Sequence, residues 1–156
     1  AVRSMVVLDR GGLPSDGVSV TRMTIRPLDW RQQPVSLRAS SIVVTRAPGS
    51  DGVSTIGPVV DNGDGTFSVT LRAGTSMGVD RYIVRLEDET GGRAVVLMPQ
   101  PSFGTFSVDR DGNGTINSDD FFRFLTDYLN GNADLNRDGM TDSRDFFDFI
   151  AAFFGG

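Results

Sequence analysis

The chain has 156 residues, with no cysteine and no histidine, and all fifteen of its basic residues are arginine. A chain of this length forms one medium domain or two small ones, since most domains have about 50 to 200 residues. The composition excludes disulfide frameworks, thiolate zinc sites, catalytic Cys–His and Ser–His–Asp sets, and lysine nucleophiles.

Negative charge is concentrated in the C-terminal third. Residues 1–104 carry eleven Arg and ten acidic residues, a net charge of +1, whereas residues 105–156 carry four Arg and ten Asp, a net charge of −6. This distribution argues against nucleic acid, whose binding needs a basic surface, and points to a cation. No apolar run reaches the roughly 18 to 20 residues of a membrane span.

We expect an extracellular or cell-surface protein. The chain begins at Ala1 without an initiator methionine, which we interpret as a secreted product that has lost an export signal, or as an excised fragment.

The first segment is an apolar arm, formed by Val2, Val6, Val7 and Leu8 before Gly11-Gly12. Such an arm can add as a strand to the sheet of a neighbouring molecule, or it can be the first strand of its own domain. The second alternative is the favoured one.

Short apolar groups separated by Gly, Pro, Asp and Asn then predict an all-β domain. In the clearest strand, residues 66–72, Phe67, Val69 and Leu71 alternate with polar residues, so that one face is buried. The other predicted strands are residues 18–26, 35–39, 42–45, 54–60, 81–87 and 94–98. About seven strands with frequent turns indicate a sandwich of two sheets.

Two glycine-rich segments predict hairpin turns, namely residues 61–65 and residues 90–92. The run Asp61-Asn62-Gly63-Asp64-Gly65 is also similar to half of a calcium loop, but no carboxylate follows at the later ligand positions, so a plain turn is favoured.

Several of these features together resemble a bacterial immunoglobulin-like domain of the invasin type. They are Ser15-Asp16-Gly17 before a strand, Asp29 followed by Pro34-Val35, and residues 61–67 before an alternating strand. The resemblance covers most of residues 15–98 and implies an immunoglobulin-like β-sandwich, in a family whose domains mostly serve as spacers or adhesive rods. With the N-terminal arm, the predicted domain is residues 1–98. Residues 99–106 follow as a predicted linker, because Pro99 and Pro101 oppose both helix and central strand.

The remaining residues, 107–156, contain an internal duplication. A shift of 25 residues superposes Asp109 on Asp134, Gly114 on Gly139 and Asp120 on Asp145. Each repeat has the spacing of a twelve-residue EF-hand loop, which needs oxygen ligands at positions 1, 3, 5, 9 and 12, a carbonyl at 7 and glycine at 6. The predicted ligands are Asp109, Asp111, Asn113, Thr115, Asn117 and Asp120 in the first loop, and Asp134, Asn136, Asp138, Met140, Asp142 and Asp145 in the second.

Oxygen-only ligands favour Ca²⁺, so two calcium ions are predicted. Position 12 is Asp instead of the common Glu, and its shorter side chain predicts a modest affinity, nearer to about 10⁻⁴–10⁻³ M than to that of cytosolic sensors. Each loop leads into a helix with apolar residues at i, i+3, i+4, i+7 and i+8, beginning at Phe121 and at Phe146. No entering helix precedes the first loop.

Two loop-helix units with Asp at position 12 resemble a dockerin, the calcium-dependent module that docks proteins into cohesins. The resemblance implies partner contacts at loop positions 10 and 11, which are Ser118 and Asp119 in one repeat and Ser143 and Arg144 in the other. Phe122 and Phe147 lie off the main apolar stripe. They either form an exposed contact patch, or they complete the small core or pack under Phe103 and Phe106, and this second alternative is the favoured one.

No catalytic set of residues stands out, so the sequence predicts a protein that is not an enzyme. The leading hypothesis is a secreted calcium-binding structural subunit of a surface complex or filament. The alternative is the spacer and dockerin of a polysaccharide-degrading enzyme that binds a cohesin. A calcium sensor of the calmodulin type is a weaker hypothesis, because the first entering helix and methionine-rich helix faces are missing.

Overall fold

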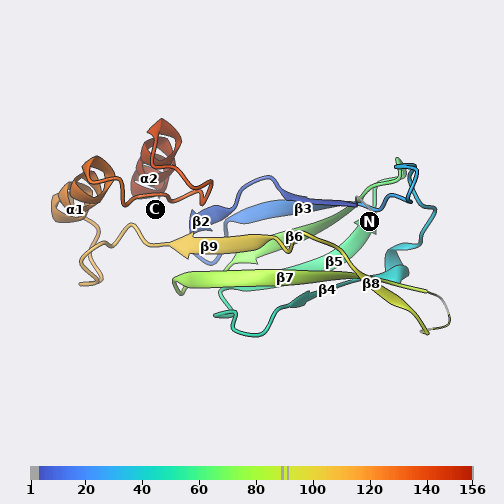
Figure 1. Ribbon diagram of the computed structural model, residues 1–156. Coiled ribbons are helices and arrows are strands. Elements are labelled where there is room, and N and C mark those ends of the chain that lie inside the picture. Colours follow the sequence, from blue (N-terminus) through green and yellow to red (C-terminus); the bar gives the residue numbers. More distant parts are fainter. Residues whose placement is uncertain (1–3, 89, 91, 156) are drawn as a thin grey trace.

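The computed structural model describes residues 4–88, 90 and 92–155, which form a β-sandwich followed by a small helical tail (Figure 1). The strands are β1 (Met5–Leu8), β2 (Gly12–Pro14), β3 (Val20–Arg26), β4 (Ile42–Arg46), β5 (Ser54–Asp61), β6 (Phe67–Ala73), β7 (Gly78–Glu87), β8 (Ala94–Val96) and β9 (Ser102–Phe106). The helices are α1 (Ser118–Leu129) and α2 (Ser143–Gly155), and Ala39–Ser41 forms a short 3-10 turn.

Two sheets face each other across one core. The first has the order β1-β3-β6-β5, and the second has the order β2-β9-β7-β4, with β8 also paired to β7. The predicted alternation is confirmed in β6, where Phe67, Val69 and Leu71 are at most 2% exposed. These side chains pack with Met23, Ile25, Tyr82 and Phe103 from both sheets, and the two-sheet sandwich predicted from the strand count is present.

The N-terminal arm is the first strand of its own sheet. From Met5 to Leu8 it pairs antiparallel with β3, which confirms the favoured alternative, while Val2 lies outside the described residues. After Asp9 the chain crosses to the second sheet, where β2 runs parallel to β9. The first strand of the domain is thus divided between the two sheets, and the crossing falls at residues 9–11.

The prediction of a linker over residues 99–106 is wrong for residues 102–106. Residues 102–106 form strand β9, which pairs with both β7 and β2, and Phe103 is fully buried in the sandwich core. The two prolines precede the strand, and the carbonyl of Pro101 accepts a hydrogen bond from the Tyr82 N–H. The prolines therefore separate β8 from β9 along the same edge of β7 and do not end the domain.

The predicted strand at residues 35–39 is also absent. The Val35 N–H donates to the Pro27 carbonyl, and Leu28 and Pro34 form an isolated bridge before the 3-10 turn. This segment connects β3 in one sheet to β4 in the other, and Pro27 and Pro34 lack the N–H groups that a ladder needs.

The tail lies at the end of the sandwich where β2 and β9 end, on the left of Figure 1. Its core contains Phe106, Phe124, Ala133, Leu135 and Phe149. Phe124 and Phe149 stack face to face, with ring centroids 3.9 Å apart. These two rings are equivalent in the duplication, so the repeats meet through the same residue.

Candidate metal-binding loops

The first loop brings three carboxylates together ahead of α1. Ligand oxygens of Asp109, Asp111 and Asp120 all lie within 4.8 Å of one another. Asp109 accepts hydrogen bonds from the backbone of Gly112 (2.9 Å) and Gly114 (2.8 Å), so the chain curls around its side chain. Carboxylates held so close repel one another, and a divalent cation of the kind that prefers oxygen ligands would offset this repulsion.

Glycine at position 6 has the backbone conformation that the loop requires. Gly114 and Gly139 have φ angles of +82° and +92°, in the left-handed region that side chains disfavour. Asn113 and Asp138, at position 5, each accept a hydrogen bond from the residue two positions later, which is Thr115 or Met140. These are the two residues whose carbonyls are predicted ligands.

The position-12 carboxylates are fully buried in both loops, at 0% exposed. Asp120 accepts from the backbone N–H groups of Arg110 (2.7 Å), Asp111 (3.2 Å) and Asn117 (2.9 Å). The Asn117 hydrogen bond, with those of the other two, lowers the pKa of the Asp120 carboxyl. Three donors on one carboxylate stabilise its charged form, which is the form that a metal binds.

The second loop repeats this pattern. Asp145 accepts from the N–H groups of Leu135 (2.7 Å), Asn136 (3.1 Å) and Asp142 (2.8 Å), which are the equivalent positions. Asp134 accepts from Gly139 at 2.9 Å, as Asp109 does from Gly114. The duplication read from the sequence is therefore also a duplication of loop geometry.

The second loop differs in how closely its acidic groups converge. Among the described residues, three acidic groups meet within 4.8 Å only in the first loop. The second loop has Asn136 instead of an acidic residue at position 3, and the carboxylate of Asp138 lies 3.6 Å from the Arg144 guanidinium.

Position 9 has a second function in each repeat, because its side chain caps the following helix. Asn117 accepts from the Asp119 N–H (2.7 Å) and forms a capping box with Asp120. Asp142 accepts from the Arg144 N–H at 2.8 Å. Capping satisfies free N–H groups at the helix start and fixes the position of the closing carboxylate.

The predicted partner residues lie on the surface of the tail. Phe122 and Phe147 are 61% and 66% exposed, so the favoured alternative, that they complete the core, is wrong, and Phe103 belongs to the sandwich instead. The core is already filled by Phe124 and Phe149, which leaves the neighbouring rings outside. Ser118, Asp119, Ser143 and Arg144 are not buried.

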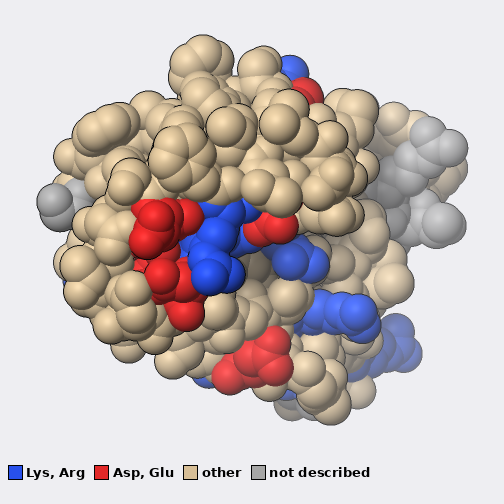
Figure 2. All heavy atoms as spheres, turned by 90° about the vertical axis from the view of Figure 1, so that its left-hand side faces the viewer, with Lys and Arg blue, Asp and Glu red and all other residues tan. Residues whose placement is uncertain are grey.

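One of the two exposed aromatic residues, Phe147, borders a groove between the tail and the sandwich. Phe147 and Arg144 line a groove of about 670 Å³ together with Leu8 and Pro101 of the sandwich. On the end of the molecule that carries the tail, acidic and basic side chains lie next to one another near the middle, and most of the face is uncharged (Figure 2).

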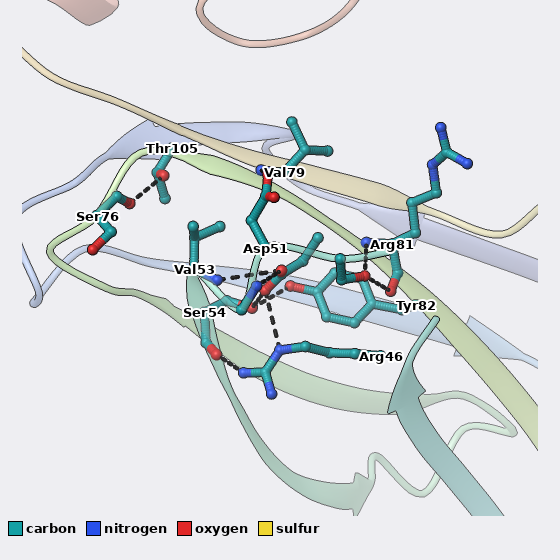
Figure 3. A network of polar contacts seen from close by, with 12 residues as sticks. Arg46, Asp51, Val53, Ser54, Ser76, Val79, Arg81, Tyr82 and Thr105 are labelled. Carbon is teal, nitrogen blue, oxygen red and sulfur yellow. Dashed lines mark hydrogen bonds and ion pairs between the residues drawn. The ribbon is translucent and has the colours of Figure 1, made fainter. Parts of the chain in front are cut away.

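Sequence patterns did not reveal a polar network inside the sandwich (Figure 3). Asp80 is fully buried on β7 and accepts hydrogen bonds from Gly52 N–H (2.6 Å), Val53 N–H (3.2 Å), Arg46 Nε (3.2 Å) and the Ser54 hydroxyl. Burial alone would raise the pKa of Asp80, but these hydrogen bonds outweigh it and the pKa is lowered. Burial also raises the pKa of Tyr82, which contacts the Ser54 hydroxyl at 2.6 Å, to about 12.

The network joins elements of the fold, because Asp80 accepts most of its hydrogen bonds and Arg46 also donates to the Ser54 carbonyl. It ties β7 to the segment between β4 and β5. The signal for it was the alternation itself, since Asp80 is in phase with the buried Tyr82 and Val84.

The architecture of residues 5–106 is an immunoglobulin-like sandwich. Solved structures with the same fold include the adhesin InvE of Yersinia pseudotuberculosis, with a TM-score of 0.55, 18% sequence identity and 67% of this chain covered. InvD of Yersinia pseudotuberculosis has a TM-score of 0.52 and 22% identity over 66% of this chain. FdeC, an Escherichia coli adhesin, has a TM-score of 0.55 and 17% identity over 68%.

At these identities the likeness is one of fold. The chain covers only 26%, 27% and 31% of the length of those three chains. No protein-family model matches the chain, and no curated protein matches its sequence. Within the described residues, no helix is both long and apolar enough to cross a membrane.

Proposed function

We propose that this chain is a non-catalytic, calcium-binding structural or assembly protein that acts outside the cell, at the cell surface. The convergence of Asp109, Asp111 and Asp120 carries the calcium assignment, because it places three oxygen donors at loop positions 1, 3 and 12. The surface location is supported by the likeness of the sandwich to bacterial adhesins.

Each loop would hold one Ca²⁺ with the residues named from the sequence. Calcium accepts six to eight oxygen ligands at flexible geometry, whereas Mg²⁺ requires a tighter octahedron and keeps its waters. The chain itself contributes carboxylates that three backbone N–H groups hold in place, and glycines that permit the sharp turn. The ion contributes positive charge to a tail whose residues 105–156 have a net charge of −6.

Counting bound calcium tests this assignment. Equilibrium dialysis with elemental analysis is expected to find two Ca²⁺ per wild-type chain, and one per chain in Asp109→Asn/Asp111→Asn or in Asp134→Asn/Asp138→Asn. The matched control is Asp61→Asn/Asp64→Asn, which alters the β5–β6 turn that resembles half a calcium loop, and it should still bind two. A concentration of 10 mM Ca²⁺ is on the order of ten times the largest dissociation constant expected. Absence of binding at this concentration would refute the proposal.

The exposed Phe122 and Phe147 support a protein partner for the tail. In the leading form of the proposal the partner is another copy of this chain, and calcium supports assembly into a complex or filament. In the alternative form the tail acts as a dockerin and binds a separate cohesin-like domain, with the sandwich as a spacer for an enzyme.

Light scattering and electron microscopy separate these forms. Large oligomers or filaments in calcium that dissociate in EDTA support self-assembly. A monomer in both conditions contradicts self-assembly and favours the cohesin-like partner. Phe122→Ser and Phe147→Ser test which aromatic face is used, since both rings are exposed and neither belongs to the tail core.

A further inference from the structure

The tail contacts the sandwich at glycine residues in and next to β2 and β9, where no side chain covers the backbone. Gly12 begins β2, and Gly104 is its register partner in β9. A Cβ atom on Gly12 would lie 1.7 Å from the Leu135 carbonyl oxygen, and one on Gly104 would lie 2.4 Å from Cδ of Arg137. Gly11 is similarly close, since its Cβ would lie 2.8 Å from the Asn136 carbonyl oxygen. Residues 135–137, positions 2 to 4 of the second loop, therefore rest directly on the sandwich.

The same positions of the first loop face elsewhere. Arg110, the counterpart of Leu135, forms an ion pair with Asp127 of α1. Gly112, the counterpart of Arg137, has open space around its Cβ direction. The duplicated loops are thus alike in their hydrogen bonds and different in what they contact.

Position 4 shows that the second loop is adapted to this contact. Both loops are left-handed there, with a φ angle of +73° at Gly112 and +61° at Arg137. Glycine adopts this conformation freely, whereas a side chain disfavours it. Arg137 nevertheless occupies the position, and its side chain lies across the backbone of Gly104.

The contact residues are held by a predicted calcium ligand. Asp145 accepts hydrogen bonds from the N–H groups of Leu135 and Asn136, whose carbonyls meet Gly12 and Gly11. Loss of the ion would leave the carboxylates of this loop unneutralised, and their repulsion would disturb the segment that Asp145 holds. An ion pair between Arg10 and Asp148 of α2 also connects the sandwich to the tail, but it is partly exposed and therefore weak.

We infer that the second loop is a calcium-dependent joint, in which a bound ion fixes the orientation of the tail on the sandwich. Calcium in the first loop stabilises the tail without setting this orientation. The inference rests on the proposed calcium binding and adds a mechanical role for one of the two sites. A surface protein with such a joint is rigid in calcium and bends between its domains without it.

The test measures the distance between the two domains. Because the chain lacks cysteine, Thr55→Cys on β5 and Phe154→Cys at the end of α2 provide two unique sites for spin labels, and both positions are exposed. Pulsed electron paramagnetic resonance is expected to give a narrow distribution of distances between the two labels in calcium and a broad one in EDTA. Asp109→Asn/Asp111→Asn should keep the narrow distribution in calcium, and Asp134→Asn/Asp138→Asn should lose it.

Two further variants disturb the contact and spare the ligands. Gly12→Ala and Arg137→Gly should each bind two Ca²⁺ and give a broad distribution in calcium, whereas the control Gly92→Ala, whose Cβ would have no atom nearer than 3.6 Å, should stay narrow. Arg137→Gly restores the residue type of the first loop, so loss of folding does not explain a broad distribution.

The outcomes separate the two proposals when calcium is counted on the same samples. If no calcium binds, the proposed function fails, and the joint fails with it. If two ions bind and the distribution stays narrow in EDTA, or if variants of either loop broaden it equally, the joint is refuted while calcium binding stands.

Discussion

Asp80→Asn removes one charge from the sandwich core and keeps the shape of the side chain. Both oxygens of Asp80 accept from donors: Oδ1 from the Gly52 and Val53 N–H groups, and Oδ2 from Arg46 Nε and the Ser54 hydroxyl. The asparagine amide must therefore point its NH₂ group at a donor in either orientation. The Arg46 guanidinium also loses its counter-charge.

The size of the effect follows from burial. Removing one partner of a buried ion pair costs about 3–5 kcal/mol. Asp80 is fully buried, but the Arg46 side chain is 38% exposed and keeps some water, so we take the lower end, about 3 kcal/mol. At about 4 °C per kcal/mol for a domain of roughly 100 residues, the melting temperature of the sandwich should fall by about 12 °C.

The assay is thermal and urea unfolding of the whole chain in calcium. Unfolding is monitored by circular dichroism at the wavelength of the β-sheet signal. Tyr82→Phe is the matched control, because it deletes only the hydrogen bond to Ser54 and should cost about 1 kcal/mol. If Asp80→Asn lost no more stability than Tyr82→Phe, the carboxylate would not be the centre of the network and our reasoning would be wrong.

Three further predictions concern pH, calcium and the tail core. The pKa of Asp80 is lowered from 3.8, so its stabilising effect is complete well above that value and is lost as the pH falls through the folded-state pKa; the acid-induced loss of stability measured below about pH 4 should be smaller in Asp80→Asn. Calcium at 10 mM, acting on two sites with Kd of about 10⁻⁴ M, should stabilise the tail by about 5 kcal/mol, and a helical melting curve unaffected by EDTA would contradict this. Phe149→Ala removes the ring stacked on Phe124 and should cost about 3–5 kcal/mol in tail unfolding, whereas Phe154→Ala, at a ring 76% exposed, should change it by less than about 0.5 kcal/mol.

The sequence predicted the elements whose signal lies within one segment. The alternation in residues 66–72 marks β6 because each second side chain enters the core. The helices follow from apolar residues at helical spacing, and the loops follow from glycine and carboxylates at fixed positions. In each case the physical cause acts over a few residues, so one short window of sequence contains it.

Strands β2 and β9 were missed because their stability comes from pairing with distant segments, β2 with β9, and β9 also with β7. β2 has three residues, including Gly12 and Pro14, and β9 follows two prolines, so neither has the composition of a strand. They pair in parallel across a separation of about ninety residues in the chain. Only the pairing explains why Phe103 is buried, and sequence periodicity carries no information about which distant segment will be the partner.

The duplication was read correctly, and its symmetry suggested two equivalent sites. The residues that break this symmetry are visible in the sequence as Arg110 against Leu135 and Gly112 against Arg137, but a loop considered alone gives no reason for either difference. An apolar residue at position 2 and a strained arginine at position 4 are unfavourable in a loop surrounded by water. They become favourable where Gly12 and Gly104 let the sandwich backbone contact the loop. A single contact therefore explains both the residues that differ between the loops and the glycines, which lie about thirty to a hundred and twenty residues away in the chain.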